Sequence, residues 1–573
     1  MKTTKPNNAK IISKLAILML LLFAFSCSSD DSDPDKDDDL SYVLTEFASG
    51  AVLHGTNGIY FGPDDNLYIA SFYGQNITVM NKKDGNIIKQ FGVSDGVLGP
   101  DDLVFHPDGE SFYFTDIMTN YVGRMSLDGT LMGYQEVAPG VNPITFSDDG
   151  RLFVALDFQG DGLYELDPNL VEAPRPIVEY APGTYPIGFL NAFDFGPDGF
   201  LYGPVFTQGF VVKVDVGEPD DPPSLDPYND GTITVVSAGF TYPVAAKFGP
   251  DGLLTVLDQT GEVFKVNIDT GEKTLFANLQ PGLDNLAFDS VGTLYVSNAD
   301  FGWIMEVMPS GEAITISEGG MIGPQGVAVL PGSNGKETVF AGDVFRMHQF
   351  NSLTGEEEEV YKGYLVPEPD KLTMPFSVQA DGDNLVVSSW FGEVVQVWSP
   401  ETDGVLEEYS MVYPIDAVRV NGKIVVSDLG LGGVVMADGQ TLIAPINVAS
   451  GLASNGVTLW AADWATGQIW QIDFDGDTPQ TPVEVASGLK YPEGLAFEKE
   501  GSLVVVETGS SSLARIDLTT GEVTTIAENL ELSGPALEGS VPTWWFDGVA
   551  VGPSGDIYIA GGGANVIYRV TQE

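Results

Sequence analysis

Short runs of alternating apolar and polar residues recur from residue 41 to the C-terminus. In the clearest copies an apolar stretch, a Pro-Asp-Gly type of turn and a second apolar stretch follow one another, as in GPDGFLYGPV from Gly196. Asp-Gly and related pairs between alternating runs are strong hairpin signals. The copies begin at Gly62, His106, Ser147, Gly196, Gly249 and Asp289, and weaker ones at Pro331, Ala380, Val420, Ala453, Glu498 and Gly552. The pattern predicts antiparallel hairpins throughout, and no helical periodicity competes with it after residue 40.

The spacing of these copies predicts the fold. There are twelve copies, they start 33 to 54 residues apart, and each has room for four short strands. Four antiparallel strands in about 45 residues make one blade of a β-propeller. We therefore predict an all-β chain that forms two tandem six-bladed β-propellers. A single twelve-bladed ring is the alternative, but its central hole would be too wide for side chains to fill.

The ends of the array indicate how each ring closes. Residues 41–48 have the pattern of a fourth strand with no blade before it, and residues 566–570 that of a third strand with no fourth after it. We expect the N-terminal strand to complete blade six, which leaves residues 313–317 free to complete blade twelve, so that no strand edge stays open. The predicted first propeller then spans residues 41–312 and the second spans residues 313–573.

The first 40 residues have a different pattern. Residues 1–26 combine a basic start with an apolar run from Leu15 to Phe25, which is typical of a secretory signal and too short to span a bilayer. The segment resembles a bacterial lipoprotein signal, which implies a lipid on Cys27. Residues 27–40 are rich in aspartate and predict a disordered tether. An acidic run at this place resembles the surface-export signal of Bacteroidetes lipoproteins.

These features predict the location of the protein. We expect it at the outer membrane on the cell surface, in contact with the membrane only through its N-terminal lipid. A plain secretory signal, with Cys27 as an unmodified residue, is the alternative.

Composition and charge narrow the range of partners. The chain of 573 residues has 81 acidic and 25 basic residues, a formal net charge of −56, which argues against nucleic acid or an anionic membrane surface as partner. A single cysteine excludes a disulfide framework and a Cys-rich zinc site. His54, His106 and His348 are too few for a His-rich metal centre, although one of them could act as a base. We expect a monomer that binds a small molecule, a glycan or a protein.

A small motif, Pro-x-Gly-apolar-Ala, marks the start of each innermost strand, where the side chain of x points toward the central channel. In the first ring five of the six x residues carry side-chain oxygens and none is basic; they are Asn57, Asp101, Asn142, Asn191 and Asp284, with Val244 as the sixth. The symmetry of the ring would bring these oxygens to one point on its axis, and hard cations such as Ca²⁺ bind about six to eight oxygens. The motif therefore predicts a site for a divalent cation. A wet channel that binds only water is the alternative.

The same motif positions in the second ring are partly apolar. They are Gln325, Phe376, Ile415, Ile446, Glu493 and Asp547. The apolar three predict a partly plugged channel, and Gln325, Glu493 and Asp547 predict a polar ligand site. Trp544 and Trp545 precede the last of these positions, where their rings could stack on a sugar or another flat ligand. Packing of these rings between blades is the alternative.

Four strings carry a resemblance to a known family: TNGIYFGPDDNLYIAS, GPDDLVFHPDGESFYFTD, GLDNLAFDSVGTLYVSN and YPEGLAFEKEGSLVVVET. They are similar to repeats of SMP-30/gluconolactonase-like and NHL-type propellers, over nearly all of residues 41–573. The first resemblance implies a divalent metal held by a Glu, an Asn and an Asp, which polarises a lactone carbonyl and activates water. Asn57 matches the Asn ligand. Asp101 and Asp284 match the Asp ligand, which would also act as the catalytic base, whereas Glu493 of the second ring matches the Glu.

The leading hypothesis is a surface-anchored protein whose propellers bind a ligand, with a divalent cation at the channel mouth as an optional component. A metal-dependent lactone or ester hydrolase of the SMP-30/gluconolactonase type is one alternative. A scaffold that binds other proteins through the blade rims is the other.

Overall fold

Each repeat of the sequence forms one four-stranded antiparallel sheet. The computed structural model describes residues 41–332, 336–365, 368–499, 501–533 and 545–572. Within these residues there are twelve such sheets and one two-stranded hairpin, which confirms the predicted all-β propeller class.

Six sheets form the first ring, and the strands of each follow one another from the central channel outward. Blades one and two are β2 (Ile59–Phe61), β3 (Leu67–Ser71), β4 (Asn76–Met80), β5 (Ile87–Phe91) and β6 (Pro100–Phe105), β7 (Ser111–Asp116), β8 (Tyr121–Ser126), β9 (Leu131–Glu136). Blades three and four are β10 (Val141–Phe146), β11 (Leu152–Leu156), β12 (Leu163–Leu166), β13 (Arg175–Val178) and β14 (Asp194–Phe195), β15 (Leu201–Val205), β16 (Phe210–Val214), β17 (Ile233–Ala238). Blades five and six are β18 (Pro243–Phe248), β19 (Leu254–Asp258), β20 (Glu262–Val266), β21 (Lys273–Asn278) and β22 (Leu283–Phe288), β23 (Leu294–Asn298), β24 (Ile304–Val307), β25 (Ala313–Ser317). The innermost strands contact one another in a closed circle that returns from β22 to β2.

The other six sheets form the second ring. Blades seven and eight are β26 (Val327–Pro331), β27 (Glu337–Asp343), β28 (Arg346–Asn351), β29 (Glu357–Lys362) and β30 (Ser377–Asp381), β31 (Asn384–Ser389), β32 (Val394–Ser399), β33 (Gly404–Ser410). Blades nine and ten are β34 (Pro414–Val420), β35 (Lys423–Asp428), β36 (Gly433–Met436), β37 (Thr441–Ala444) and β38 (Ala449–Ser454), β39 (Leu459–Asp463), β40 (Gln468–Ile472), β43 (Val483–Ala486), with the hairpin β41 (Phe474–Asp475) and β42 (Thr478–Pro479). Blades eleven and twelve are β44 (Pro492–Glu498), β45 (Ser502–Glu507), β46 (Ser512–Asp517), β47 (Val523–Glu528) and β48 (Val549–Val551), β49 (Ile557–Gly561), β50 (Val566–Gln572), β1 (Tyr42–Ser49). Here the circle of innermost strands returns from β48 to β26.

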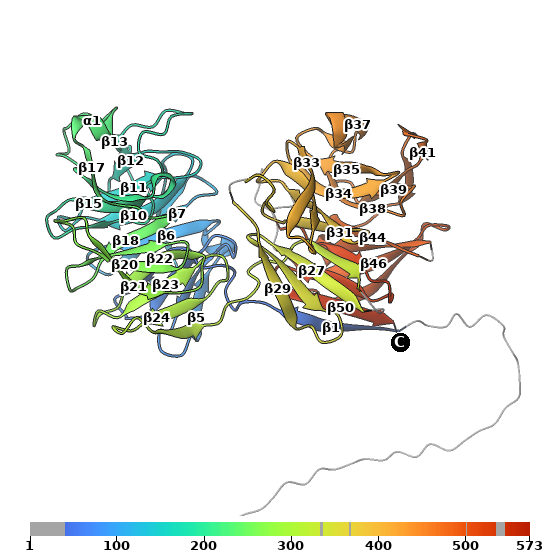
Figure 1. Cartoon of the computed structure of the whole chain (residues 1–573), viewed down its shortest axis with the longest axis horizontal. Helices are drawn as coiled ribbons and strands as arrows, with labels where there is room; N and C mark the ends of the chain where they lie inside the picture. Colours follow the sequence, from blue (N-terminus) through green and yellow to red (C-terminus); the bar gives the residue numbers. More distant parts are fainter. Residues whose placement is uncertain (1–40, 333–335, 366–367, 500, 534–544, 573) are drawn as a thin grey trace, which may run out of the picture. The chain divides into compact units, whose positions relative to one another are not determined.

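Ring closure differs from the expectation. β1 pairs with β50 of blade twelve, from Tyr42 opposite Gln572 to Ser49 opposite Val566, and Figure 1 shows the blue β1 beside the red β50. β25 (Ala313–Ser317) pairs with β24 of its own blade six. The expected exchange of these two strands is therefore wrong. Blade six already has four strands of its own, whereas blade twelve has three until β1 is added, so the first ring lies between two parts of the second in the sequence.

The burial of each strand follows from its place in the blade. β7 is buried along its whole length, because apolar side chains of blades one and three pack on its two faces. The outermost strand β33 alternates between exposed and half-buried side chains. Burial of apolar area between neighbouring blades is therefore the main stabilising interaction of each ring.

Two chain segments cross between the rings and bond to each other. The N–H of Gly50, at the end of β1, donates to the carbonyl of Asn565, and the N–H of Ala51 donates to the carbonyl of Met321 at 2.8 Å. Beside this crossing lies an apolar cluster with members from both rings, including Ala51, Ile322 and Phe376. Residues 42–573 accordingly form one compact unit.

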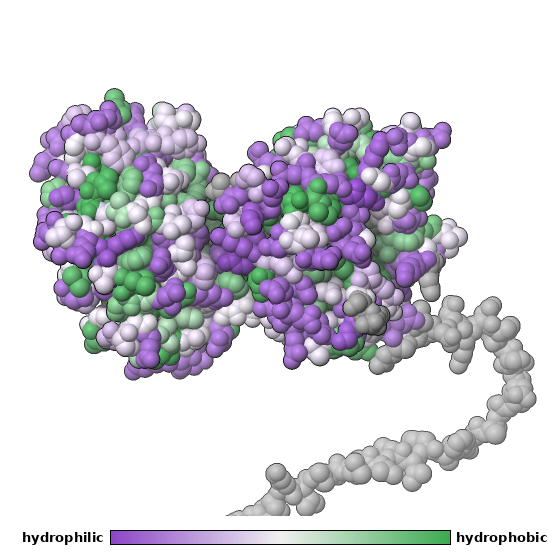
Figure 2. All heavy atoms as spheres, viewed as in Figure 1, coloured by the Kyte–Doolittle hydropathy of each residue, from purple (hydrophilic) through white to green (hydrophobic). Residues whose placement is uncertain are grey.

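Helices are short in the described residues. α1 (Pro227–Asp230) has one turn, and four 3₁₀ turns cover Val93–Asp95, Phe206–Gln208, Asp438–Gln440 and Thr508–Ser510. None of the helices in this part of the chain has the length and apolar character that crossing a membrane requires. Figure 2 shows polar side chains over much of the visible face of both rings, with small apolar patches between them.

Candidate functional site

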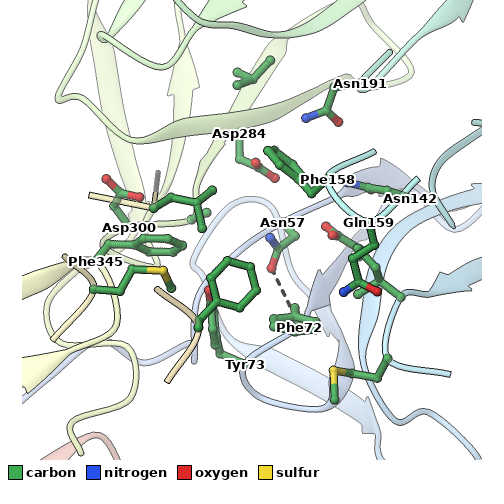
Figure 3. Close-up of a pocket in the computed structure, with 18 of the residues that line it drawn as sticks. Asn57, Phe72, Tyr73, Asn142, Phe158, Gln159, Asn191, Asp284, Asp300 and Phe345 are labelled. Carbon is green, nitrogen blue, oxygen red and sulfur yellow. Dashed lines mark hydrogen bonds between the residues drawn. The ribbon is translucent and has the colours of Figure 1, made fainter. Parts of the chain in front are cut away.

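The two rings share a cavity of about 520 Å³. In each blade the innermost strand begins, and the second strand ends, on the same face of the ring, because the two strands are antiparallel. The first ring lines the cavity with both of these segments from all six blades, and the second ring lines it with segments of blades seven, eight, nine and twelve. Figure 3 shows the side chains of both rings around this space.

All six x residues of the first ring line this cavity: Asn57, Asp101, Asn142, Asn191, Val244 and Asp284. The amides are held in place by hydrogen bonds. The Asn57 Oδ1 atom accepts from the N–H of Phe72 at 3.2 Å, and the Asn191 Oδ1 atom accepts from the N–H of Ala192 at 2.8 Å. The Asn142 Nδ2 atom donates to Asp157 at 2.8 Å. The motif thus forms a polar floor, as ring symmetry predicts, while its affinity for a cation stays a prediction.

The glycine after x has a structural reason. The N–H of Gly58 donates to the carbonyl of Asp101 at 2.6 Å, and a Cβ atom at Gly58 would lie 2.4 Å from the Asp102 Oδ1 atom. Neighbouring innermost strands can approach this closely only where one of them lacks a side chain. Where Asp102 replaces the glycine, its carboxyl accepts from the N–H of Ile144 at 3.1 Å and from the Asn285 Nδ2 atom at 3.2 Å. Asp102 and Asn285, which stand where the motif has glycine, therefore connect blades two, three and six.

The carboxyl groups of the floor affect one another's ionisation. Burial raises the pKa of Asp101 well above its usual range, and the charges of Asp157 and Asp102 raise it further. Burial and the charges of Asp101 and Asp102 likewise raise the pKa of Asp284. The charge of Lys247, a residue that is 9% exposed, lowers the pKa of Asp284 and of Asp102 and so partly offsets the effect of burial. The floor therefore favours protons or another positive charge.

Aromatic side chains form most of the remaining wall. Ten of the 24 lining residues are aromatic: Phe72, Tyr73, Phe158, Phe206, Phe345, Phe376, Trp390, Phe391, Tyr413 and Trp545. Tyr73 of the first ring makes edge contacts with Phe345 and Trp545 of the second, with ring centroids 5.7 and 5.5 Å apart. Trp390 stacks between Phe376 and Tyr413, at 5.1 and 5.3 Å. The wall is therefore an apolar surface built by both rings.

Most of these aromatic residues were missed by the sequence analysis, although a signal for them exists. Phe72, Phe206 and Trp390 each follow directly on the last residue of the second strand of their blade, and Phe158 and Phe345 follow one residue later. The strand pattern assigns those positions to the face that carries the x residues. An aromatic residue at the end of a second strand is thus a sequence signal for the wall of this cavity.

Two of the loops beside the cavity have strained backbones. Phe158 has φ of 54° and Val344, next to Phe345, has φ of 45°. Residues with a Cβ atom rarely adopt positive φ, and a β-branched residue such as valine hardly ever does. Each such residue costs about 1–3 kcal/mol, and such strain clusters at ligand sites. The strain places two aromatic rings, those of Phe158 and Phe345, at the cavity wall.

An ion pair joins the rings at the edge of the cavity. Arg346 of blade seven bonds to the carboxyl of Asp300 in blade six, and both side chains are 6% exposed. The Arg346 guanidinium also lies over the ring of Phe301, 4.9 Å from its centroid. Burial raises the pKa of Asp300, and the charge of Arg346 counteracts this. Asp300 thus lines the cavity with its charge already paired.

The predicted residues of the second ring divide into two groups. Gln325, Glu493 and Asp547 are almost fully buried, and they do not line the shared cavity. The N–H of Asp547 donates to the Glu493 Oε2 atom at 2.9 Å, and the N–H of Phe546 donates to the Gln325 Oε1 atom at 3.3 Å. These three side chains therefore belong to a network inside the ring, and a ligand role for them stays a prediction.

The two predicted tryptophans also have different outcomes. Trp545 lines the shared cavity, whereas Trp544 lies outside the described residues, as does the predicted lipidation residue Cys27. The ring of Trp545 contacts Tyr73, so it takes part in the wall between the rings.

The fit of a divalent cation can be judged from the donors of the floor. Asp101 and Asp284 supply carboxylates, but the oxygens of Asn57 and Asn191 already accept backbone N–H groups. Among the residues that the structure describes, no three His, Cys, Asp or Glu side chains converge closely enough to hold a metal ion. Hard cations take most of their ligands from carboxylates, carbonyls and water. The floor thus offers two carboxylates and a partly used set of amide oxygens.

Comparison with known proteins gives only distant structural matches. No family model and no curated protein matches the chain. Among solved structures, a streptogramin B lyase has 16% identity and a TM-score of 0.36, with 52% of this chain and 94% of that chain covered. A catalytically inactive virginiamycin B lyase from Staphylococcus aureus with quinupristin has 15% identity and a TM-score of 0.35, with 55% and 97% covered. The extracellular domain of BT4673 from B. thetaiotaomicron has 12% identity and a TM-score of 0.30, with 93% and 81% covered.

Proposed function

We propose that this protein binds a small amphipathic molecule in the cavity between its two rings. The cavity itself carries the proposal: about 520 Å³ is enough for a metabolite-sized ligand, and the wall combines a polar floor with aromatic sides. Ligand sites are typically largely apolar clefts with a few polar groups that fix orientation. The strained backbone at Phe158 and Val344 supports the same conclusion, because such strain clusters at ligand sites and here it positions the aromatic wall.

A lactonase mechanism is less well supported. Asn57 lies at the floor together with Asp101 and Asp284, as the family resemblance requires. Glu493, the match to the Glu ligand, is 2% exposed inside the second ring and bonds to Asp547 there. The ligand set that the resemblance implies is therefore divided between two rings. Ca²⁺ at the floor remains the alternative occupant, and titration with calcium chloride distinguishes it from an organic ligand.

The experiment uses a neutral fluorescent dye, N-phenyl-1-naphthylamine, whose emission rises in apolar surroundings. We expect one dye to bind per chain, and Val244→Phe to weaken this binding at least tenfold, because Val244 lines the floor and is 2% exposed. Only the dye fluorescence that Val244→Phe removes is assigned to the cavity. Dye that binds to the apolar N-terminal segment is present in both chains and cancels in this comparison.

Val291→Phe is the matched control, because Val291 is 83% exposed and does not line the cavity. It should bind the dye as the unmodified chain does. If Val244→Phe keeps its fold, as judged by thermal unfolding, and still binds the dye normally, the proposed site is refuted. Absence of dye binding to the unmodified chain would also refute it, and would favour the scaffold hypothesis.

The proposal includes the location of the protein. A lipid on Cys27 and the acidic segment that follows it would hold the two rings outside the outer membrane, where a ligand from the medium can reach the cavity. The support is the sequence pattern of residues 1–40, and replacement of Cys27 is the test.

A further inference from the structure

Asp101 and Asp284 differ from most buried carboxyl groups around them. Asp161 accepts from the backbone N–H groups of Ile187, Gly188 and Phe189 at 2.6 to 3.0 Å, and Asp258 holds a loop in the same way. Among the described residues, by contrast, nothing donates a hydrogen bond to the side chain of Asp101 or Asp284. Both are half-buried, and both line the cavity. Their carboxyl groups therefore have no role in holding the backbone.

A third carboxyl group lies behind these two. Asp157 is 0% exposed, and its Oδ1 atom has no hydrogen-bond partner among the described residues. Its other oxygen, Oδ2, accepts a hydrogen bond from the Nδ2 atom of Asn142, which lines the floor, and its charge raises the pKa of Asp101. The pKa of each of these carboxyl groups is raised, so a positive charge bound beside them would favour their ionised forms. This is an observation separate from the cavity and its aromatic wall.

The wall is suited to a positive charge on an organic group. None of the described residues that line the cavity is Lys, Arg or His, and ten of them are aromatic. The face of an aromatic ring attracts a cation within about 6 Å, and the attraction is strongest where water is excluded. Carboxylates and aromatic rings together are the usual surroundings of a bound ammonium group.

A bare metal ion fits these surroundings less well. The oxygens of Asn57 and Asn191 are turned to backbone N–H groups, and only two carboxyl groups line the floor beside them. An ammonium group needs fewer ligands, since two carboxylates and a ring face can satisfy its N–H groups and its charge. The apolar side chains of the second ring would meet the body of such a ligand.

We infer that the ligand of this cavity is an organic cation, whose ammonium group lies between Asp101 and Asp284 while its apolar body contacts the aromatic wall. This inference rests on the proposed function, and it adds the chemical class of the ligand. It also gives separate roles to the parts of the cavity: the floor of the first ring recognises the charge, and the aromatic wall of both rings recognises the apolar part.

The test compares two probes with the same body, 2-(1-naphthyl)ethylammonium and 2-(1-naphthyl)ethanol, by displacement of the neutral dye from the full chain. We expect the ammonium to displace the dye at a concentration at least tenfold lower than the alcohol. In the double variant Asp101→Asn and Asp284→Asn, which keeps the shape of both side chains, the two probes should displace it equally. The double variant Asp269→Asn and Asp403→Asn removes the same charge from exposed positions, and it should keep the preference.

Each other outcome has a distinct meaning. Equal displacement by ammonium and alcohol in the unmodified chain overturns the inference but leaves the proposed function intact, provided that Val244→Phe still abolishes dye binding. A preference for ammonium that survives in the Asp101 and Asp284 variant also overturns it. Calcium chloride is titrated alone by calorimetry: tight one-to-one binding that this variant abolishes, with no preference for the ammonium, would assign the floor to a metal.

Discussion

At the scale of single residues, His348 shows how a buried charge is held in this fold. Its side chain is 0% exposed in β28, with its Nε2 atom 3.2 Å from Asp343 and its Nδ1 atom 2.6 Å from Glu357. Both ring nitrogens face a carboxylate, so both carry protons. Asp343 also accepts from the N–H groups of Ile322 and Gly323, in the segment that crosses between the rings. The histidine is thus a structural cation near the crossing, and it does not line the cavity.

The charge of His348 predicts a dependence of stability on pH. Burial alone would lower the pKa of His348, but the hydrogen bonds and charges of Asp343 and Glu357 raise it to about 9, above the unfolded value of 6.5. Its contribution to the free energy of unfolding is therefore complete below about pH 6.5 and is lost as the pH rises through about 9. We expect His348→Gln to cost up to about 3 kcal/mol more at pH 6 than at pH 10. Urea unfolding of both chains at the two pH values measures this difference.

His106→Gln is the control for this prediction. The side chain of His106 is 25% exposed and lies beside the exposed Asp108 at 2.8 Å, so its replacement should cost less than 1 kcal/mol or so at either pH. A cost of His348→Gln that is the same at pH 6 and pH 10 would contradict the assignment of His348 as a buried cation.

At the scale of elements, β1 decides how the second ring is closed. Its eight residues supply the outermost strand of blade twelve, and the pairing with β50 includes a bulge between Glu46 and Ala48. The edge of β50 that β1 covers would otherwise be open to other strands. Because β1 contributes nothing to the sheets of the first ring, its loss should affect the two rings differently.

Removal of residues 1–49 tests this difference. We expect the amides of β50 to lose hydrogen-exchange protection, and the second ring to unfold at a temperature several degrees lower, while β2 and β22 of the first ring keep their protection. Removal of residues 1–40 alone is the control, and it should leave both rings unchanged. Loss of protection in blade six, as the sequence-based pairing of residues 41–48 with that blade would produce, would show the strand assignment to be wrong.

The blades and the polar floor could be predicted from the sequence. The strand that closes the second ring and the second ring's part of the aromatic wall could not. Each blade is a local unit whose turns and alternation lie within about 45 residues, and the start of its innermost strand fixes where Asn57 or Asp284 lies. The partner of β1 depends on contacts more than 500 residues away, and residues 41–48 suit the edge of blade six as well as that of blade twelve. The second ring's part of the aromatic wall depends on how the two rings pack against each other. This packing brings Trp390 and Phe376 over the first ring, and no pattern within a single repeat predicts it.

At the scale of the whole molecule, the net charge of the protein bears on how it can be held at a membrane. The formal net charge of −56 is distributed over residues of both rings and the acidic N-terminal segment. A charge of this size keeps a protein soluble and repels polyanions, including an anionic membrane surface. Retention at a membrane therefore requires an anchor other than the surface of the rings.

Cys27 provides the test of that anchor. We expect Cys27→Ser to move the protein from the membrane fraction to the soluble fraction after cell lysis, because the only residue that could carry the lipid is lost. A lipid chain contributes about 0.8 kcal/mol per buried CH₂ group, so its removal should change partitioning completely. Ser28→Ala is the control and should remain with the membrane. A Cys27→Ser protein that still sediments with membranes would contradict lipidation.

The pairing of β1 with β50, the strand that is synthesised last, has a consequence for folding during biosynthesis. The Thr45 hydroxyl of β1 donates to the carbonyl of Arg569 in β50, across 524 residues of sequence. Chains fold from the N-terminus as they emerge, so the first ring can close once its sixth blade has been made. β1 has to wait, unpaired, until the final strand is synthesised. Only a chain that is synthesised as far as β50 can complete the second ring, which covers the cavity. Premature termination therefore yields molecules that have the carboxyl groups of the floor but no closed second ring above them.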